Sequence, residues 1–281
     1  MKHAYLIMAH EQFEVLKLLV ASLDDPRNDI YIHFDRKVKH VPSLSTRNSR
    51  LFVLEDRVRV IWGDVSQIKA EYALFKAAYS EGEYGYYHLI SGIHFPLKSQ
   101  DEIHSYFDTV QGKCVMRCES LSQEEIDMRF GYYHFFLKHL IDRRRWVNKL
   151  YHLGWRFMLS VQKRMGIRRD TSFVHGKASQ WCSLTEDAVG LLLNFEKDSL
   201  KNFSRSFCSD EFFVRSVIDG KVDICDDDRI CYVEFVNTTP KKFSLADYGI
   251  LMDSGAFFAR KFSDRNIDLC EKIINTIKTR Q

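Results

Sequence analysis

The chain has 281 residues, of which 45% are hydrophobic and 28% charged, and its formal net charge is +3. This length and composition suit one large α/β domain or two small ones with a substantial core, and they argue against disorder over most of the chain. The net charge is too small to indicate a nucleic-acid partner by itself.

The seven cysteines are odd in number and lack paired Cys-x-x-Cys spacing. They indicate reduced thiols and neither a disulfide framework nor a zinc site. The apolar start at 4–9 is interrupted by His10 and Glu11, so it is too short for a signal-peptide core. No run approaches the length of a membrane span. We therefore expect a cytoplasmic protein.

The first hundred residues alternate between strand and helix patterns. We predict strands at 4–9, 30–34, 58–62 and 87–90, and helices at 11–23 and 67–79, the second capped by Ser66. A strand, a helix and a strand joined by short connections form a parallel βαβ unit with a right-handed crossover. This part of the chain is therefore expected to form a nucleotide-binding α/β sheet.

Ligands of such open sheets bind beyond the carboxyl ends of the strands. In this chain His10 follows the first predicted strand, and residues 35–37, which begin with Asp35, follow the second. Asp64 follows the third strand, and the pair Ser91-Gly92 follows the fourth. No GxGxxG or GxxxxGK[ST] pattern is present, which disfavours dinucleotide enzymes and P-loop NTPases. A nucleotide would therefore have to be held in another way.

A basic stretch occupies 138–169, where ten Lys or Arg residues stand against the single acid Asp142. Aromatic and aliphatic residues, among them Trp146, Leu150 and Phe157, are interleaved with the charges. The pattern predicts a basic helical arm. Two interpretations stay open, an arm packed on the domain and a helix that rests on the membrane surface. Nucleic-acid binding is a weaker third option, because no basic signature recurs elsewhere.

After this arm, 180–184 is typical of a short strand or loop, and Ser183 with Glu186 forms a capping box for a helix through Phe195. Another helix is expected after Ser209, a second capping box at 244–247, and a terminal helix from Asn266. There is no repeat or low-complexity segment. We expect one compact domain, 1–281.

Four segments in a fixed order carry the indications of function: YYHLISGIHFPLK at 86–98, QWCSL at 180–184, SDE at 209–211 and FARKF at 258–262. Together with YIHFDRK at 31–37 they resemble the core-2/I-branching β-1,6-N-acetylglucosaminyltransferase family, which also contains the peptide O-xylosyltransferases. The resemblance runs from about residue 4 to about residue 261. It implies a GT-A-like fold, with 1–110 as the nucleotide-sugar-binding half and 111–281 as the acceptor and catalytic half.

The resemblance also implies roles for individual residues in an inverting enzyme that uses a UDP-sugar without the usual metal-binding DxD. Glu211 falls on the catalytic base and Lys261 on a ligand of the donor diphosphate, while Lys241 is more loosely similar to a second such ligand. His10 and Asp35 fall near the uridine pocket. No metal and no cofactor are expected.

At the acceptor sugar, the resemblance implies contacts by Glu119 and Arg129. For Trp181, a core position and a sugar-stacking platform stay open as alternatives. From the residue types alone, an alternative for the Asp-Glu pair at 210–211 is the first turn of a capped helix. The alternative for the Lys pair at 241–242 is a solvated turn. The acidic run 226–228 is interpreted as a solvated turn and not as a metal site.

The chemistry of these residue types agrees with the implied roles. Inverting transfer is a single displacement, so one carboxylate that takes the proton of the acceptor hydroxyl suffices. Fixed Lys side chains can offset the charge that develops on the departing diphosphate, as a divalent cation does in most GT-A enzymes. The chain departs from the family at Ser209, Asp64 and Lys242, where Pro, Gly and Thr are usual. These departures leave the donor sugar and the diphosphate geometry open.

We therefore expect a bacterial-type, inverting, metal-independent transferase that moves a sugar from UDP to a hydroxyl of a saccharide or lipid-linked oligosaccharide, in surface polysaccharide or glycoconjugate assembly. N-acetylglucosamine is the leading donor sugar. Peripheral membrane contact through 138–169 is part of this expectation, and nucleic acid is not. The alternatives are a UDP-xylose or UDP-glucuronate donor, and a non-catalytic membrane- or carbohydrate-binding protein.

Overall fold

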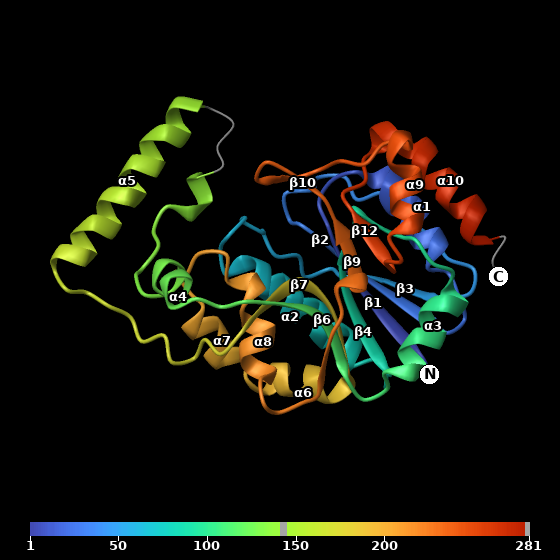
Figure 1. Ribbon diagram of the computed structural model, residues 1–281, viewed down its shortest axis with the longest axis horizontal. Coiled ribbons are helices and arrows are strands. Elements are labelled where there is room, and N and C mark those ends of the chain that lie inside the picture. Colours follow the sequence, from blue (N-terminus) through green and yellow to red (C-terminus); the bar gives the residue numbers. More distant parts are fainter. Residues whose placement is uncertain (141–144, 279–281) are drawn as a thin grey trace.

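The computed structural model describes residues 1–140 and 145–278, so Asp142, Arg143 and Arg144 of the basic stretch lie outside the described residues. Figure 1 shows a central sheet with helices on both faces and a helical arm at one end. The expected α/β class, with a mostly parallel central sheet flanked by helices, is confirmed. The sheet takes strands from both 1–110 and 111–281, and the functional division between these halves stays a prediction.

The larger sheet has the strand order β3-β2-β1-β4-β7-β6-β8. Within it β7 runs antiparallel to β4 and β6, whereas the other paired strands are parallel. Its strands are β1 His3–Ala9, β2 Asn28–Phe34, β3 Arg50–Val53, β4 Tyr86–Ser91, β6 Cys114–Glu119, β7 Lys177–Leu184 and β8 Ile224–Asp226.

A smaller sheet packs beside the first. Its middle strand, β12 (Phe258–Arg260), is antiparallel to β5 (His94–Pro96) and parallel to β9 (Cys231–Val233). A short hairpin, β10 (Phe235–Val236) and β11 (Thr239–Pro240), lies between β9 and β12 in the chain. The sequence motifs at 86–98 and 258–262 therefore become neighbours, because β5 and β12 are paired.

The helices divide between the two faces of the larger sheet, with α4 and α5 at one end (Figure 1). One face is covered by α1 Phe13–Ser22, α3 Gln100–Thr109, α9 Tyr248–Asp253 and α10 Ile267–Lys278. The other face is covered by α2 Ser66–Tyr79, α6 Glu186–Asn194, α7 Glu196–Asn202 and α8 Phe213–Ile218. The remaining helices are α4 Gln123–Arg129, α5 Arg145–Arg164 and the 3₁₀ turns η1 Leu137–His139, η2 Ser209–Glu211, η3 Asp228–Ile230, η4 Leu245–Asp247 and η5 Asp264–Asn266.

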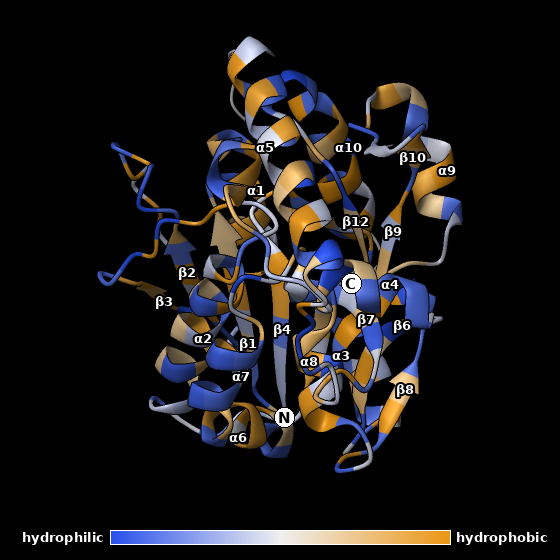
Figure 2. Cartoon of the chain, turned by 90° about the vertical axis from the view of Figure 1, so that its left-hand side faces the viewer, coloured by the Kyte–Doolittle hydropathy of each residue, from blue (hydrophilic) through white to orange (hydrophobic). Residues whose placement is uncertain are grey.

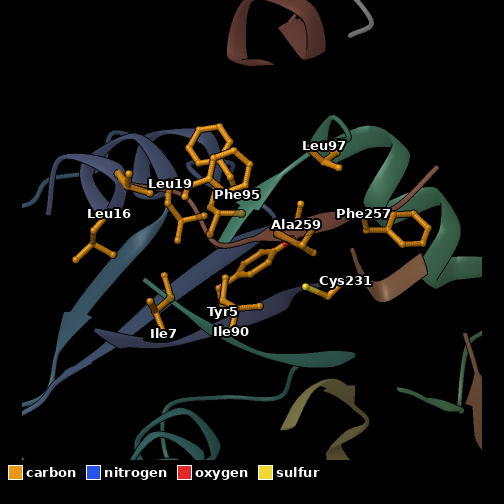
Figure 3. Packing of buried hydrophobic residues seen from close by; sticks show 14 of the residues in the cluster. Tyr5, Ile7, Leu16, Leu19, Ile90, Phe95, Leu97, Cys231, Phe257 and Ala259 are labelled. Atoms are coloured by element: carbon orange, nitrogen blue, oxygen red, sulfur yellow. The ribbon is translucent and has the colours of Figure 1, made fainter. Parts of the chain in front are cut away.

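Two hydrophobic clusters form the core, one on each face of the sheet. Every residue of β1, β2 and β4 is buried, as expected for parallel strands covered on both faces. In Figure 3, Tyr5 of β1 and Ile90 of β4 face Ala259 of β12, while Phe95 of β5 lies near Leu19 of α1. This packing fixes β12, and the residues that follow it, against the sheet.

One predicted strand is wrong. Residues 58–62 do not join the sheet, and its edge strand is instead β3, which pairs with β2. Near Val58 the chain crosses the end of β2, where the Val58 N–H donates to His33 Nε2 and the Val58 carbonyl accepts from Arg36 N–H. These polar contacts at the strand end take the place of the ladder bonds that the apolar pattern led us to expect.

Two predicted helix caps are also wrong. Ser66 is the first residue of α2, and its hydroxyl accepts from the Ile61 N–H instead of capping the helix. Ser183 lies within β7 and bonds to His88, and the residue that caps α6 is Thr185, whose hydroxyl accepts from the Ala188 N–H. The capping box predicted at 244–247 is confirmed. In both wrong cases the hydroxyl bonds to a group outside the helix, which is five residues away for Ser66 and on a separate strand for Ser183.

The basic stretch forms α5, which is joined to the body through η1 and the segment after Gly166 (Figure 1). Gln162 on its inner side exchanges hydrogen bonds with the backbone of Tyr133. The arm is thus packed on the domain, as one of the two interpretations expected. Among the described residues, no helix combines the length and the apolar character that crossing a membrane requires.

Candidate active site

The predicted site residues gather at the carboxyl edge of the larger sheet. His10 follows β1, Asp35 follows β2, and Glu119 ends β6. Lys177 lies at the same edge, since β7 is antiparallel and its first residue pairs with Glu119. Four strand spacings separate β2 from β6, which is about 19 Å at roughly 4.8 Å each. The edge is therefore long enough for a nucleotide at one end and an acceptor at the other.

The β1–β2 end of this edge brings together His10, Asp35 and Lys261. Asp35 is buried, and its carboxylate accepts from the Lys37 N–H at 2.8 Å and pairs with the Lys37 amine at 3.1 Å. Burial lowers the pKa of His10, Glu11 and Asp35 oppose that shift, and the charge of Lys261 adds to it. These groups therefore lie within electrostatic reach of one another.

Lys261 and Lys241 occupy different electrostatic surroundings. The Lys241 amine is paired with Glu234 at 3.1 Å and with Asp247 at 2.8 Å. Lys261 makes no ion pair within the described part of the chain, and burial together with the positive charge of Arg260 lowers its pKa. The two residues are backbone neighbours, because the Lys261 N–H donates to the Lys241 carbonyl at 3.2 Å. Lys261 is thus the cation left available for an anionic ligand.

Arg260 connects the donor end to the acidic pair 210–211. Its guanidinium lies over the ring of Trp181 at 4.9 Å, and its Nε is buried without a hydrogen-bond partner among the described residues. Burial lowers the pKa of Arg260, and Asp210 and Glu211 are among the groups that oppose this shift. Arg260 and Lys261 are adjacent in the chain, so Glu211 and Lys261 belong to the same edge of the molecule.

Trp181 is only 7% exposed. Its ring contacts the His94 ring edge to face, with ring centroids 4.8 Å apart, and the Arg260 guanidinium lies over the same Trp181 ring. In this arrangement the ring holds Arg260 in position. Its contact with an acceptor sugar stays a prediction.

Glu211 ends the 3₁₀ turn η2, which packs against β7 and α2. The turn follows Cys208, which adopts a left-handed conformation (φ 50°) and whose N–H donates to the carbonyl of Gly63. The Gln67 amide donates to Asp210 at 2.9 Å, and its oxygen accepts from the Gly63 N–H. The loop before α2 therefore holds the turn that presents Glu211.

A chain of charged groups joins Glu211 to Glu119 at the end of β6. Arg129 donates to Glu211 Oε2 at 3.0 Å and pairs with Glu125 at 2.9 Å. Lys177 continues the chain, since its amine lies 3.0 Å from Glu125 and 2.9 Å from Glu119. The structure thus brings together Glu211, Arg129 and Glu119, which come from three separate parts of the sequence.

Next to Glu211 lie two further carboxyl groups, of which Glu71 is buried and Asp210 partly buried. Burial, and next the charge of Glu211, raise the pKa of Asp210 to about 6. Burial raises the pKa of Glu71 well above its ordinary range, and Asp210 adds to that effect. Gln180 donates to Glu71 at 2.7 Å. The motif residues at 180 and 210 therefore serve a buried polar cluster beneath the turn.

The acidic run 226–228 has protein donors for its carboxylates. Asp227 pairs with Arg229 and accepts from the Tyr106 hydroxyl, and Asp226 accepts from the Cys118 N–H. Among the described residues, no group of three or more His, Cys, Asp or Glu side chains is arranged to hold a metal ion. The seven cysteines are free thiols.

Sequence reasoning missed four members of this site: Glu125, Lys177, Gln67 and Arg260. Arg260 precedes Lys261 in a quoted motif, so its position could have been noticed. Glu125 and Arg129 are four residues apart on α4, a spacing typical of a helical ion pair. Lys177 and Gln67 carry no comparable signal, because their partners come from other parts of the chain.

Comparison with solved structures finds distant likenesses. The apo form of mouse xyloside xylosyltransferase 1 is similar with 10% identity and a TM-score of 0.39, over 92% of this chain and 96% of that chain. S. aureus TarS 1-349 is similar with 10% identity and a TM-score of 0.26, over 50% of this chain and 44% of that chain. No curated protein matches the sequence.

The family model described as "Core-2/I-Branching enzyme" matches residues 3–241. That range contains the βαβ start, the motif at 86–98, the tryptophan motif at 180–184 and the turn that presents Glu211. The chain therefore belongs to the core-2/I-branching enzyme family, and it is a glycosyltransferase that takes a sugar from a nucleotide-sugar donor to a saccharide acceptor.

Proposed function

We propose that the protein is an inverting glycosyltransferase that uses a UDP-sugar, with N-acetylglucosamine as the leading donor sugar, and needs no metal ion. The supporting observation is the division of charge along one edge of the sheet. A carboxylate, Glu211, lies at the acceptor end, and an amine without an ion-pair partner among the described residues, Lys261, lies at the donor end. Arg260 lies between them.

In this proposal the reaction is a single displacement. The oxygen of an acceptor hydroxyl bonds to the anomeric carbon of the donor sugar as the bond from that carbon to UDP breaks. The hydroxyl proton passes to Glu211. Arg129 donates to Glu211 Oε2, and this contact orients the carboxylate while Oε1 faces the acceptor. The product is a β-linked sugar when the donor is an α-linked UDP-sugar.

The charge that develops on UDP must be offset where it appears. Lys261 supplies a positive charge. Burial and the charge of Arg260 lower its pKa, and the opposing effect of Glu11 is smaller. Lys241 is proposed as a second, weaker contributor, because Glu234 and Asp247 already neutralise it. His10 and Asp35 at the ends of β1 and β2 are proposed to bind the uridine.

The deciding experiment measures UDP release and sugar transfer with and without EDTA, for the wild type and for Glu211→Gln. The general-base role predicts that Glu211→Gln lowers kcat by about 10²- to 10⁴-fold, while UDP still raises the Tm. Glu124→Gln is the matched control, since Glu124 is an exposed acid on α4. Loss of transfer in EDTA would contradict metal independence.

The same assay separates the alternatives. Hydrolysis or transfer with UDP-xylose or UDP-glucuronate, and not with UDP-N-acetylglucosamine, would identify a different donor within the family. No turnover with any UDP-sugar, despite UDP binding, would favour the non-catalytic carbohydrate-binding alternative.

A further inference from the structure

An uncovered apolar stripe runs along α5. Its members are large hydrophobic residues with exposed fractions of 60% or more: Trp146 69%, Leu150 60%, Leu153 67% and Phe157 64%. Their spacing of four, three and four residues places them on one face of the helix. Figure 2 views the molecule from the side of α5 and shows hydrophobic and hydrophilic residues along this helix. Such a continuous exposed stripe, unlike a single exposed residue, indicates an interaction site.

The stripe is not the face that α5 uses to pack on its own domain. The packed face carries Trp155, whose Nε1 donates to His134 at 3.0 Å and whose ring lies 5.6 Å from that of Phe207. Gln162 on the same face is buried and bonded to Tyr133. Because these contacts fix the helix from its other side, the stripe stays turned away from the body.

A row of exposed basic residues lies beside the stripe. Lys149, Arg156 and Lys163 are seven residues apart, so they align along the helix next to the apolar residues. The sequence of α5 contains no Asp or Glu. A helix with an apolar face, a basic flank and no acid has the composition of helices that lie in the interface of anionic membranes.

We propose that α5 docks on an anionic lipid bilayer, with its apolar stripe in the headgroup region and its basic row on lipid phosphates. The charge pattern favours this occupant over a second copy of the chain. In a symmetric helix pair, both basic rows would lie at the contact, and α5 has no acid to offset them. Lipid phosphates supply the missing negative charge.

The face of α5 opposite the apolar stripe contacts the segment that precedes Glu211. Trp155 packs on Phe207, which lies four residues before Glu211 and whose N–H donates to the carbonyl of Arg129 at 3.1 Å. A membrane bound by the stripe would therefore lie on the outer side of α5, and α5 would link the lipid surface to the segment before Glu211. This step rests on the proposed function, and it gives the acceptor class as a saccharide carried on a lipid.

The test is co-sedimentation of the whole protein with vesicles of phosphatidylcholine alone or with added phosphatidylglycerol. We expect binding that requires the anionic lipid and weakens as salt is raised. Leu150→Ser should lower the partition coefficient about tenfold. Ile250→Ser, a similarly exposed aliphatic residue on α9, should leave it unchanged. Replacing Lys149 and Arg156 by Gln should lower it about fivefold per charge, and Lys197 and Lys201 on α7 provide the matched pair of control positions.

Transfer to a water-soluble acceptor keeps this test separate from the proposed function. Both α5 variants should retain that activity and the wild-type Tm, because the stripe and the basic row do not touch the site. Equal binding to both vesicle types, or binding that neither α5 variant reduces, would overturn the proposal. A dimer in analytical ultracentrifugation that Leu150→Ser converts to a monomer would also overturn it and assign the stripe to a second copy.

Discussion

Replacing Asp210 by Asn should stabilise the protein at neutral pH. Asp210 is the middle residue of the turn η2, where burial and the charge of Glu211 raise its pKa to about 6. Its contact with Gln67, an amide that donates at 2.9 Å, survives the change because an Asn oxygen accepts the same bond. The substitution therefore removes an unfavourable negative charge without removing its hydrogen bond.

The magnitude follows from the proton that the carboxyl holds. Between the ordinary pKa of 3.8 and about 6, folded Asp210 binds a proton that the unfolded chain has lost. Stability consequently falls by about 1.4 kcal/mol for each pH unit in that interval, or about 3 kcal/mol in all. The favourable contribution is complete below pH 3.8 and is lost as the pH rises through 6. At pH 7 the Asn variant should gain about 3 kcal/mol, or about 5 °C in Tm for a chain of this length.

The assay is the Tm of both proteins from pH 4 to pH 8. The gain should be absent near pH 4, should grow toward pH 6 and should stay constant above it. Asp227→Asn is the control of opposite sign, because hydrogen bonds from Arg229 and Tyr106 outweigh burial and lower the pKa of Asp227 to about 2. That variant should lose about 2 kcal/mol at pH 7. If the Tm of Asp210→Asn were below that of the wild type at every pH, the carboxylate of Asp210 would not destabilise the fold.

Five further substitutions, at four positions, probe the site. Arg129→Gln should lower kcat about tenfold with UDP affinity unchanged, because Arg129 orients Glu211 at the acceptor end, and Arg129→Lys should recover part of the loss in the same kinetic assay. Lys261→Ala should weaken UDP binding about 10- to 100-fold in calorimetry, and Lys241→Ala by less, since Lys241 already has two carboxylate partners. Gly63→Ala should lower both Tm and kcat, because φ is +73° and the added Cβ would lie 3.1 Å from a ring that packs before the catalytic turn. Unchanged kcat in Gly63→Ala would mean that this loop does not position the turn.

The parts of the fold that could be predicted are those whose signal is local. Continuous apolar runs predicted β1, β2 and β4 correctly, because strands covered on both faces are apolar throughout. The run at 58–62 is also mostly apolar, although Arg59 interrupts it, and polar contacts with His33 and Arg36 hold it outside the sheet. Caps failed for a similar reason, since a hydroxyl near a helix start can bond to a distant strand, as Ser183 does to His88.

In the site, too, features with a local sequence signal could be predicted, and contacts between distant parts of the chain could not. The ends of the predicted strands indicated that His10 and Asp35 lie at the edge of the sheet, and the motif resemblance is the source of the roles proposed for Glu211 and Lys261. The sequence alone did not predict that Lys241 is paired with two acids, because Glu234 and Asp247 lie on either side of it in separate turns. Among the ion pairs that join Glu119 to Glu211, only Glu125–Arg129 has the spacing of a helical pair, whereas the contacts of Lys177 depend on the pairing of β6 with β7.

The loss of stability that comes from burying Asp210 can be explained by the need to position Glu211. A carboxylate that serves as a base has to reach solvent, so few contacts can hold it directly. The neighbouring side chain is therefore fixed instead: Asp210 is tied to Gln67, and Cys208 to Gly63, both within 1–110. From 111–281, Arg129 holds Glu211 itself and the backbone of Phe207. Glu211 is thus positioned by contacts from both parts of the chain. An Asn at 210 would keep this geometry and remove the electrostatic cost, so stability and activity at this position need not oppose each other.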